Sequence, residues 1–228
     1  MNKYLIELKK LKKNFNHESV KIELFKNVNL GIKKGELIAL VGPSGSGKSS
    51  LLHILSLLDK PTSGKIVING KDSKTFNEQQ KKEIRRKKIS IIFQDNNLLS
   101  DFSAIENVLM PLIIRGEDYK SSLQKAKKIL DEVRLDDRYN HFPSELSGGE
   151  QQRVAIARSL ISETSLILAD EPTGNLDFKT SNDVFSYFIK LKKLKKTIIF
   201  ATHNRELANK ADYKLSISSG IIKRVNVK

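Results

Sequence analysis

"GPSGSGKS", residues 42–49, follows the apolar run "ELIALV" at residues 36–41 and precedes the apolar run "LLHILSLL" at residues 51–58. The eight residues fit the pattern G-x-x-x-x-G-K-[ST], in which a glycine-rich loop joins a buried strand to a helix. Such a loop can wrap phosphate oxygens, because its backbone N–H groups point inward. We therefore expect this loop and the next residue to bind nucleotide phosphates: Gly42, Pro43, Ser44, Gly45, Ser46, Gly47, Lys48, Ser49 and Ser50.

Lys48 and Ser49 supply the two side-chain functions of this loop. The Lys48 ammonium can reach the β- and γ-phosphates, and the Ser49 hydroxyl can bind Mg²⁺. A glycine- and serine-rich turn could instead join a strand to a helix and bind nothing. We favour the phosphate site, because the lysine and the serine stand in register with the glycines and the flanking runs suit a strand and a helix.

A second candidate motif is "LILADE" at residues 166–171. Its apolar residues place Asp170 at the C-terminal end of a strand, where doubly wound sheets bind ligands. We expect Asp170 to hold the water shell of Mg²⁺ and Glu171 to polarise a water for attack on the γ-phosphate. A solvated carboxylate at a strand end is the alternative for Glu171, and the phosphate loop makes it the weaker interpretation.

Strand and helix patterns alternate from about residue 36, which predicts an α/β fold with a mainly parallel sheet. Before that point, residues 4–8 and 21–32 are typical of strands in an antiparallel edge. We expect a charged helix at about residues 77–88 and a helix-rich insert at 104–135, with its first helix broken or kinked at Pro111.

The composition excludes some kinds of site and bears on which partners the protein can attract. The 228 residues carry a formal net charge of +15 and contain no cysteine, which excludes disulfides, zinc fingers and thiol chemistry. Such a charge attracts nucleic acid or an anionic membrane surface. We favour a solvated, lysine-rich surface, because the runs at 85–88 and 192–196 have no interleaved aromatic residues. No apolar run is long enough to cross a bilayer and no secretory signal is present, so we expect an intracellular protein.

"NKAD", residues 209–212, matches the N-K-x-D element by which GTPases recognise guanine. That element should directly follow a strand, whereas this copy lies within "RELANKADY", which we expect to be a helix. A chance match is the better interpretation, and the expected nucleotide is ATP.

The stretch "LSGGE", residues 146–150, adds a second glycine-containing helix start. Free N–H groups at a helix start favour an anion, and nothing within one chain need satisfy them. An ordinary capping box, with Ser147 as N-cap and Glu150 three residues later, fits the same pattern, and both interpretations can hold together.

The phosphate loop, "LILADE" and "LSGGE" together resemble the ATP-binding-cassette (ABC) ATPases over nearly the whole chain. In that family two nucleotide-binding domains face each other head to tail, and the signature of one closes over the ATP held by the other. The resemblance therefore implies a homodimer in which these residues contact a second copy's ATP: Ser147, Gly148, Gly149 and Glu150.

Four further residues are assigned by this resemblance alone. Gln94, after "ISIIF", is similar to the glutamine that binds magnesium and links to the membrane partner. Asp177, in "GNLD", is similar to the residue that crosses the dimer interface. His203, in "FATHN", is similar to the histidine that contacts the γ-phosphate. Phe15, in "KKNF", is similar to the aromatic residue that stacks on adenine, which is more often tyrosine in the family.

Within the family, residues 51–64, 96–112 and 168–177 look like the branch that serves lipoprotein release, macrolide export and cell division. "LLSDFSAIENV" at 98–108 is most similar to the lipoprotein-releasing ATPases, although Asn96, Asn97 and Ser100 depart from their usual pattern. The resemblance implies an ATPase that drives lipoprotein release, with ATP and Mg²⁺ as cofactors. A division-type mechanotransmission ATPase, a macrolide exporter and a soluble ATPase acting on nucleic acid are the alternatives.

The expected organisation is a single nucleotide-binding domain over residues 1–228, with a core of about 1–94 and 162–228 and a helical subdomain of about 95–161. The resemblance implies two membrane permease subunits as partners, a lipoprotein cargo handled by them and no direct contact with nucleic acid. It implies a peripheral location on the cytoplasmic face of the inner membrane. Leu98, Leu99 and Phe102 suit docking to a permease, and burial in the core of the helical subdomain is the equal alternative.

Overall fold

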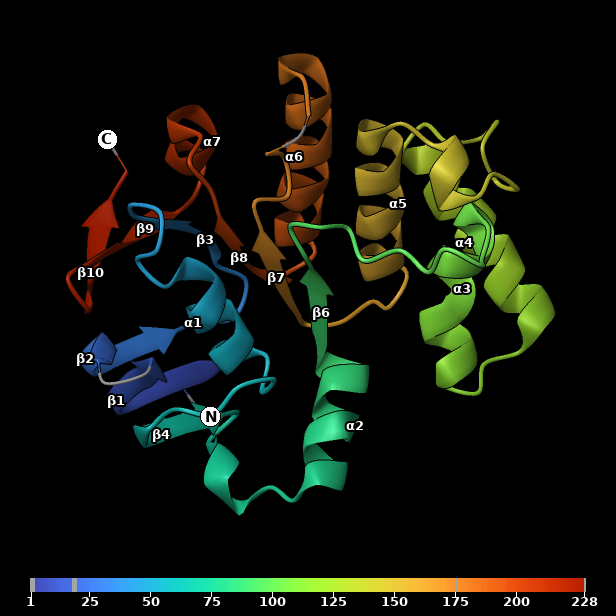
Figure 1. The fold of residues 1–228 in the computed structure, drawn as a ribbon. Helices are drawn as coiled ribbons and strands as arrows, with labels where there is room; N and C mark the ends of the chain where they lie inside the picture. The colour runs from blue at the N-terminus through green and yellow to red at the C-terminus, as the bar shows by residue number, and fades with distance from the viewer. Residues whose placement is uncertain (1–2, 18–19, 175, 228) are drawn as a thin grey trace.

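Two β-sheets share one hydrophobic cluster with helix α1 (Lys48–Leu55), which lies close to both in Figure 1. The computed structural model describes residues 3–17, 20–174 and 176–227. In this part of the chain, the larger sheet has the strand order β10-β9-β3-β8-β7-β6 and the smaller sheet the order β2-β1-β4-β5. The α/β prediction is therefore confirmed.

The larger sheet consists of β3 (Leu37–Val41), β6 (Ile89–Ile92), β7 (Leu166–Asp170), β8 (Thr197–Ala201), β9 (Tyr213–Ser218) and β10 (Ile221–Asn226). All its strand pairs are parallel except β9 with β10. Every residue of β8 is buried, as expected for a parallel strand that is covered on both faces. Because parallel strands end at the same edge of a sheet, the segments that follow β3, β6, β7 and β8 all start there.

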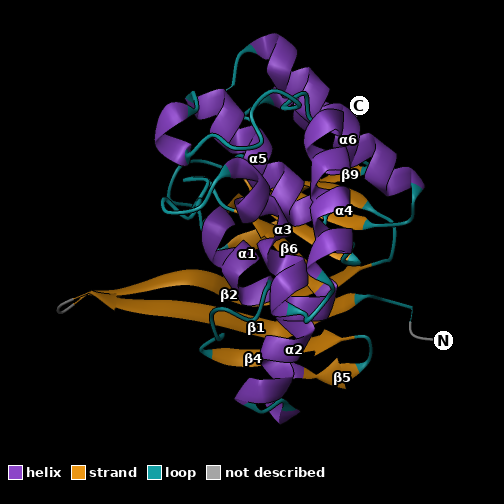
Figure 2. Ribbon diagram, turned by 90° about the vertical axis from the view of Figure 1, so that its right-hand side faces the viewer, coloured by secondary structure: helices purple, strands orange, loops and turns teal. Residues whose placement is uncertain are grey.

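The smaller sheet consists of β1 (Ile6–His17), β2 (Val20–Ile32), β4 (Ser63–Ile68) and β5 (Lys71–Asp72). The sequence predicted β1 and β2 as strands of an antiparallel edge, and their antiparallel pairing is confirmed. Because β1 also pairs with β4, these strands form a sheet of their own. Figure 2 shows β1 and β2 as a long hairpin that extends to one side of the molecule. The larger sheet has an antiparallel edge strand as well, β10.

The helices after α1 are α2 (Glu78–Lys88), α3 (Ala104–Ile114), α4 (Tyr119–Glu132), α5 (Gly148–Leu160), α6 (Phe178–Lys193) and α7 (Arg205–Asn209). Side chains of α3, α4 and α5 form a hydrophobic cluster of their own. Helix α5 also packs through Ile156 and Leu160 against the cluster that lies between the larger sheet, α6 and α7. None of the helices in the described residues combines the length and apolar character that a bilayer crossing requires.

Two helices differ in extent from what the sequence predicted. Helix α3 continues through Pro111 to Ile114, so the expected break is absent, and Val108, Leu109 and Leu112 on both sides of the proline are buried in the α3–α5 cluster. Helix α7 ends at Asn209, so Asp212 lies outside it, just before β9.

The Asp212 carboxylate has structural partners. It accepts a hydrogen bond of 2.8 Å from the Leu37 N–H and pairs with the Lys192 ammonium. These contacts give the aspartate of "NKAD" a role in joining β3 to α6, and they agree with the interpretation of the motif as a chance match.

Candidate nucleotide-binding site

The loop between β3 and α1 has a backbone that requires glycine at two positions. Gly47 has a φ of 100°, and a Cβ there would lie 2.9 Å from Leu24 Cγ and 3.0 Å from Phe25 Cζ. A Cβ on Gly42 would lie 2.6 Å from the Ile217 carbonyl oxygen. The left-handed backbone and the close contacts exclude larger residues, so the loop keeps its N–H groups accessible.

Lys48 is the first residue of α1, and its side chain is buried within the loop. Its ammonium donates hydrogen bonds to the carbonyls of Gly42 at 3.2 Å and Pro43 at 3.3 Å. The same nitrogen lies 3.2 Å from His203 Nε2, at the end of β8. The loop therefore holds a positive charge at the sheet edge where the parallel strands end.

Glu171 follows Asp170, the last residue of β7, and has a φ of 45°, which is unusual for a residue other than glycine. Its N–H donates to the Ala201 carbonyl at 3.2 Å. One carboxylate oxygen accepts a hydrogen bond of 3.3 Å from the His203 N–H, and the other lies 3.4 Å from His203 Nε2. That second oxygen, Oε1, is buried without a hydrogen-bond partner, so it has the capacity to accept one from a water or a ligand.

These side chains surround one pocket of about 310 Å³. It is lined by Phe15, Leu24, Ser44, Gly45, Gly47, Lys48, Ser49, Ser50, Gln94, Asp170, Glu171 and His203. Residues from β1, the phosphate loop and the ends of three core strands thus meet, although they are up to about 190 positions apart in the chain. Gly42 borders an adjacent pocket of about 500 Å³ with His203, while Pro43 and Ser46 line neither.

Oxygen donors that suit Mg²⁺ are present in the pocket. The Ser49 hydroxyl, the Gln94 amide and the Asp170 carboxylate all line it. Mg²⁺ prefers oxygen ligands and is usually bound through one or two carboxylates together with substrate phosphates. Within the described residues, no cluster of three or more His, Cys, Asp or Glu could hold a metal by itself. The donor set therefore fits a magnesium ion that arrives with a phosphate ligand.

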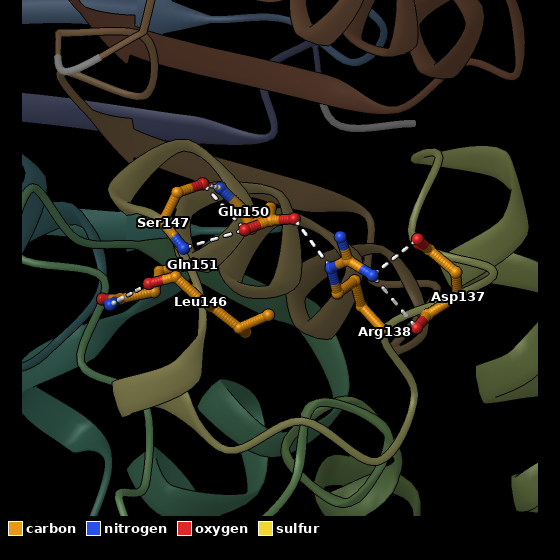
Figure 3. A network of polar contacts seen from close by, with 6 residues as sticks. All are labelled: Asp137, Arg138, Leu146, Ser147, Glu150 and Gln151. Carbon is orange, nitrogen blue, oxygen red and sulfur yellow. Dashed lines mark hydrogen bonds and ion pairs between the residues drawn. The ribbon is translucent and has the colours of Figure 1, made fainter.

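Ser147 and Glu150 form a complete capping box at the start of α5 (Figure 3). One Glu150 oxygen accepts hydrogen bonds of 2.8 Å from both the N–H and the hydroxyl of Ser147, and Arg138 Nε donates to the other at 3.0 Å. The hydrogen bond from the Ser147 N–H is the main cause that lowers the pKa of Glu150. The carboxylate of Glu150 is thus charged and satisfied within the chain.

Neither the packing nor the backbone conformation within the chain explains why residues 148 and 149 are glycine. A Cβ on Gly148 would meet no atom within 4 Å, and one on Gly149 would first meet Leu176 Cδ2 at 3.4 Å. Neither has a left-handed backbone. Ser147 and Gly148 are exposed, and none of these three residues lines the pocket around Lys48. Figure 1 shows α5 beyond β7 and β6 as seen from α1, so the structure does not bring the two predicted phosphate motifs of one chain together.

Asp177 is the exposed N-cap of α6. Its carboxylate accepts from the Thr180 hydroxyl and, at 3.0 Å, from the Thr180 N–H; the hydroxyl hydrogen bond is the main cause that lowers the pKa of Asp177. Asn175, in the same motif, lies outside the described residues. Asp177 is separate from the Lys48 pocket.

Arg158 is a residue that sequence reasoning missed. From the C-terminal half of α5, its half-buried guanidinium donates two hydrogen bonds of 2.7 Å, one to the Asn96 carbonyl and one to the Asn97 carbonyl. Burial lowers the pKa of Arg158. Both asparagines have φ values between 43° and 47°, a conformation that asparagine tolerates better than most residues. The Asn-Asn pair was the available signal, since consecutive asparagines favour such a turn.

The apolar residues after Asn97 were expected either to dock to a permease or to lie in the core of the helical subdomain, and they differ in burial. Leu98 packs against the α3–α5 cluster, whereas Leu99 and Phe102 are exposed. A buried Asn107 holds this segment, because its side chain accepts from the Leu99 N–H at 2.8 Å and donates to the Leu99 carbonyl at 3.0 Å. Leu99 and Phe102 are thus presented to solvent on a fixed loop close to Gln94 in the chain.

Comparison with known proteins gives consistent results. Residues 25–174 match the family model described as ABC transporter. The chain is 47% identical to the lipoprotein-releasing system ATP-binding protein LolD of Rickettsia typhi, over 97% of this chain and 99% of that protein. It is 43% identical to LolD of Legionella pneumophila strain Paris, over 96% and 97% of the two chains.

Solved structures resemble the fold over nearly its whole length. The ATP-binding cassette MJ0796, described as a dimer in a post-hydrolysis state bound to ADP and Pi, superimposes with a TM-score of 0.93 and 36% identity, covering 98% of this chain and 99% of the other. CbiO1 of Clostridium perfringens, part of the ABC transporter complex cbiONQ, gives a TM-score of 0.85 at 26% identity, covering 100% and 90%.

Replacing Lys48 by alanine should weaken ATP binding by roughly 100-fold or more, because charge-assisted hydrogen bonds to phosphate are lost. Isothermal titration calorimetry at fixed Mg²⁺ concentration measures this. Lys34→Ala removes the same charge from an exposed position and should leave the affinity unchanged. Equal affinities for Lys48→Ala and the parent protein would contradict the placement of phosphates in this loop.

Proposed function

The chain belongs to the ABC transporter family and is an ATPase, and we propose that it drives the release of lipoproteins from a bacterial inner membrane. The observation that carries the proposal is the identity of 42–49% to proteins named LolD and to one further ABC ATP-binding protein, over nearly the full length of each. The pocket that contains Lys48, Asp170, Glu171 and His203 supports the ATPase activity by its chemistry.

The phosphate loop binds the substrate in this account. The N–H groups of residues 42–49 and the Lys48 ammonium contact the β- and γ-phosphates, and Phe15, which lines the same pocket, stacks on the adenine. Ser49, Gln94 and Asp170 would hold Mg²⁺, which supplies positive charge that stabilises the phosphates.

Glu171 is proposed as the general base. A water attacks the γ-phosphorus, the bond from this phosphorus to the bridging oxygen breaks to release ADP, and Glu171 accepts the proton of the water. The unpartnered Oε1 of Glu171 suits this role, because it has no competing hydrogen bond. His203, 3.2 Å from the Lys48 ammonium and 3.4 Å from Glu171, is proposed to contact the γ-phosphate.

Changing Glu171 to glutamine should slow ATP hydrolysis by about 10²- to 10⁴-fold while ATP binding remains, because the amide keeps the shape of the side chain but cannot accept a proton. Phosphate release under saturating ATP, together with a binding titration, separates the two quantities. Glu206→Gln is an exposed control that should hydrolyse ATP at the parental rate. Parental hydrolysis by Glu171→Gln would exclude this residue as the base.

The signature is proposed to act on a second copy. The Ser147 N–H donates to Glu150, but Gly148 and Gly149 lie in the first turn of α5, where backbone N–H groups have no intrahelical partner, and the two glycines have no requirement within the chain. A γ-phosphate held by the loop of a partner chain is a ligand that such a surface suits. Asp177, exposed at the start of α6, is proposed to lie at the same interface.

The proposed complex contains a homodimer of this chain and two membrane permease subunits, on the cytoplasmic face of the inner membrane. The chain attaches as a peripheral protein, and the permease handles the lipoprotein. The separate cluster of α3, α4 and α5 supports a division into a core of about 1–94 and 162–228 and a helical subdomain of about 95–161. Leu99 and Phe102, exposed on the loop after Gln94, supply apolar surface for docking.

The cellular task is tested by depletion in a bacterium that carries this chain. Lipoproteins destined for the outer membrane should then remain in the inner membrane, as measured by fractionating a tagged lipoprotein. The parent gene should restore delivery and the Glu171→Gln variant should not. Normal delivery in filamentous cells would favour a division-type ATPase, and ATPase activity stimulated by nucleic acid without a membrane partner would favour the soluble class; either result contradicts lipoprotein release.

A further inference from the structure

Lys13 is a buried cation next to the pocket described above. Its side chain lies on β1, two residues before Phe15, and the residue is only 8% exposed. The Lys13 ammonium lies 2.7 Å from the Asp59 carboxylate and donates to the Lys60 carbonyl at 3.0 Å. It also lies 4.8 Å from the centroid of the Phe15 ring. Two hydrogen-bond partners and an aromatic ring thus surround the charge.

Stability alone is a poor explanation for this arrangement. Burial of the Lys13 ammonium carries a desolvation penalty that opposes its attraction to Asp59, whose side chain is 34% exposed. A lysine that pairs with an aspartate at the surface would avoid that penalty. The buried position also brings the ammonium against the Phe15 ring, where a cation is attracted by the electrons of the ring.

Phe15 both contacts this charge and lines the pocket. The Phe15 side chain is 42% exposed and lines the same pocket as Lys48, whereas Lys13 does not line it. An ammonium against an aromatic ring draws electron density from it. A ring polarised in this way is a better stacking partner for an electron-rich purine, because the repulsion between the two π systems falls.

The segment that holds Lys13 is also tied to the phosphate loop. Asp59 and Leu58 donate their N–H groups to the His53 carbonyl on α1, and the Thr62 hydroxyl accepts from the Asn14 N–H at 2.9 Å. Helix α1 begins at Lys48, and its eight residues span about 12 Å. Helix α1 therefore connects Lys48, in the phosphate loop, to the segment that holds Lys13 against the Phe15 ring.

We propose that Lys13, held by Asp59, is a positioning residue that fixes and polarises the Phe15 ring as a platform for the adenine base of ATP. This inference rests on the proposed assignment of Phe15 to adenine. It predicts that Lys13 affects the binding of the base and has no effect on the binding of the phosphates.

Inorganic tripolyphosphate separates the two contributions, because it carries the phosphates of ATP without the base. Dissociation constants of the full-length chain for ATP and for tripolyphosphate are measured by calorimetry at fixed Mg²⁺. Lys13→Met should weaken ATP binding about 2- to 10-fold, within the range of an aromatic stacking contact, and leave tripolyphosphate binding unchanged. Lys13→Arg keeps the charge and should restore most of the ATP affinity. Lys12→Met, an exposed control on the same strand, should change neither affinity.

Phe15→Ala distinguishes the failure of this inference from the failure of its premise. If Phe15→Ala leaves the ratio of the ATP and tripolyphosphate affinities unchanged, the assignment of Phe15 to adenine is wrong. If Phe15→Ala lowers ATP affinity selectively and Lys13→Met does not, the role of Lys13 is wrong. Loss of both ligands by Lys13→Met would also overturn the proposal, since it would show a general effect on the fold or the phosphate site. Retained tripolyphosphate binding reports that the variant is folded.

Discussion

Backbone hydrogen bonds between β3, β8, β7 and β6 set the relative positions of the side chains in the proposed site. Their parallel register places Asp170 opposite Ala201 and Ile92 opposite Ala169, so the segments that carry Glu171, His203 and Gln94 leave the sheet side by side. Leu40 also pairs with Ala201, which brings the phosphate loop after β3 to the same edge. A shift of one strand by a single residue would exchange the side chains on its two faces. It would also move the segment after that strand away from the segments that carry the other site residues. The burial of the strands therefore protects the geometry on which catalysis depends.

Helix α5 has a second organising role. Its first turn presents the signature glycines, and Arg158 near its other end holds the carbonyls of Asn96 and Asn97, two and three residues after Gln94. The same helix contributes to the α3–α5 cluster and to the cluster beneath the larger sheet. The proposed contact surface at residues 147–149 and the loop after Gln94 are thus joined by one helix. This arrangement suits a protein in which a nucleotide at one surface must affect a partner at another.

Local patterns in the sequence were enough to predict the phosphate loop, the strand that ends at Asp170 and the α/β class, because each depends on neighbouring residues. Features that depend on distant residues were not predictable. The hydrogen bonds of Arg158 join residues about 60 positions apart, and the pairing of β1 with β4 joins two strands that are far apart in the sequence. Packing of α3 overrides the helix-breaking tendency of Pro111. Lys13 is one of many lysines in the sequence, and only the fold shows that it is buried against Phe15.

The central claim is that each ATP lies between the phosphate loop of one chain and the signature of another. Because the chain contains no cysteine, single cysteines can be introduced without background reaction. Ser44→Cys lies in the phosphate loop and Ser144→Cys lies three residues before the signature, and both positions are exposed. A bifunctional maleimide added to an equimolar mixture of the two variants, in a Glu171→Gln background, should give cross-linked heterodimers that require ATP and Mg²⁺. A cross-link that forms equally without ATP, or its absence at saturating ATP, would contradict the account.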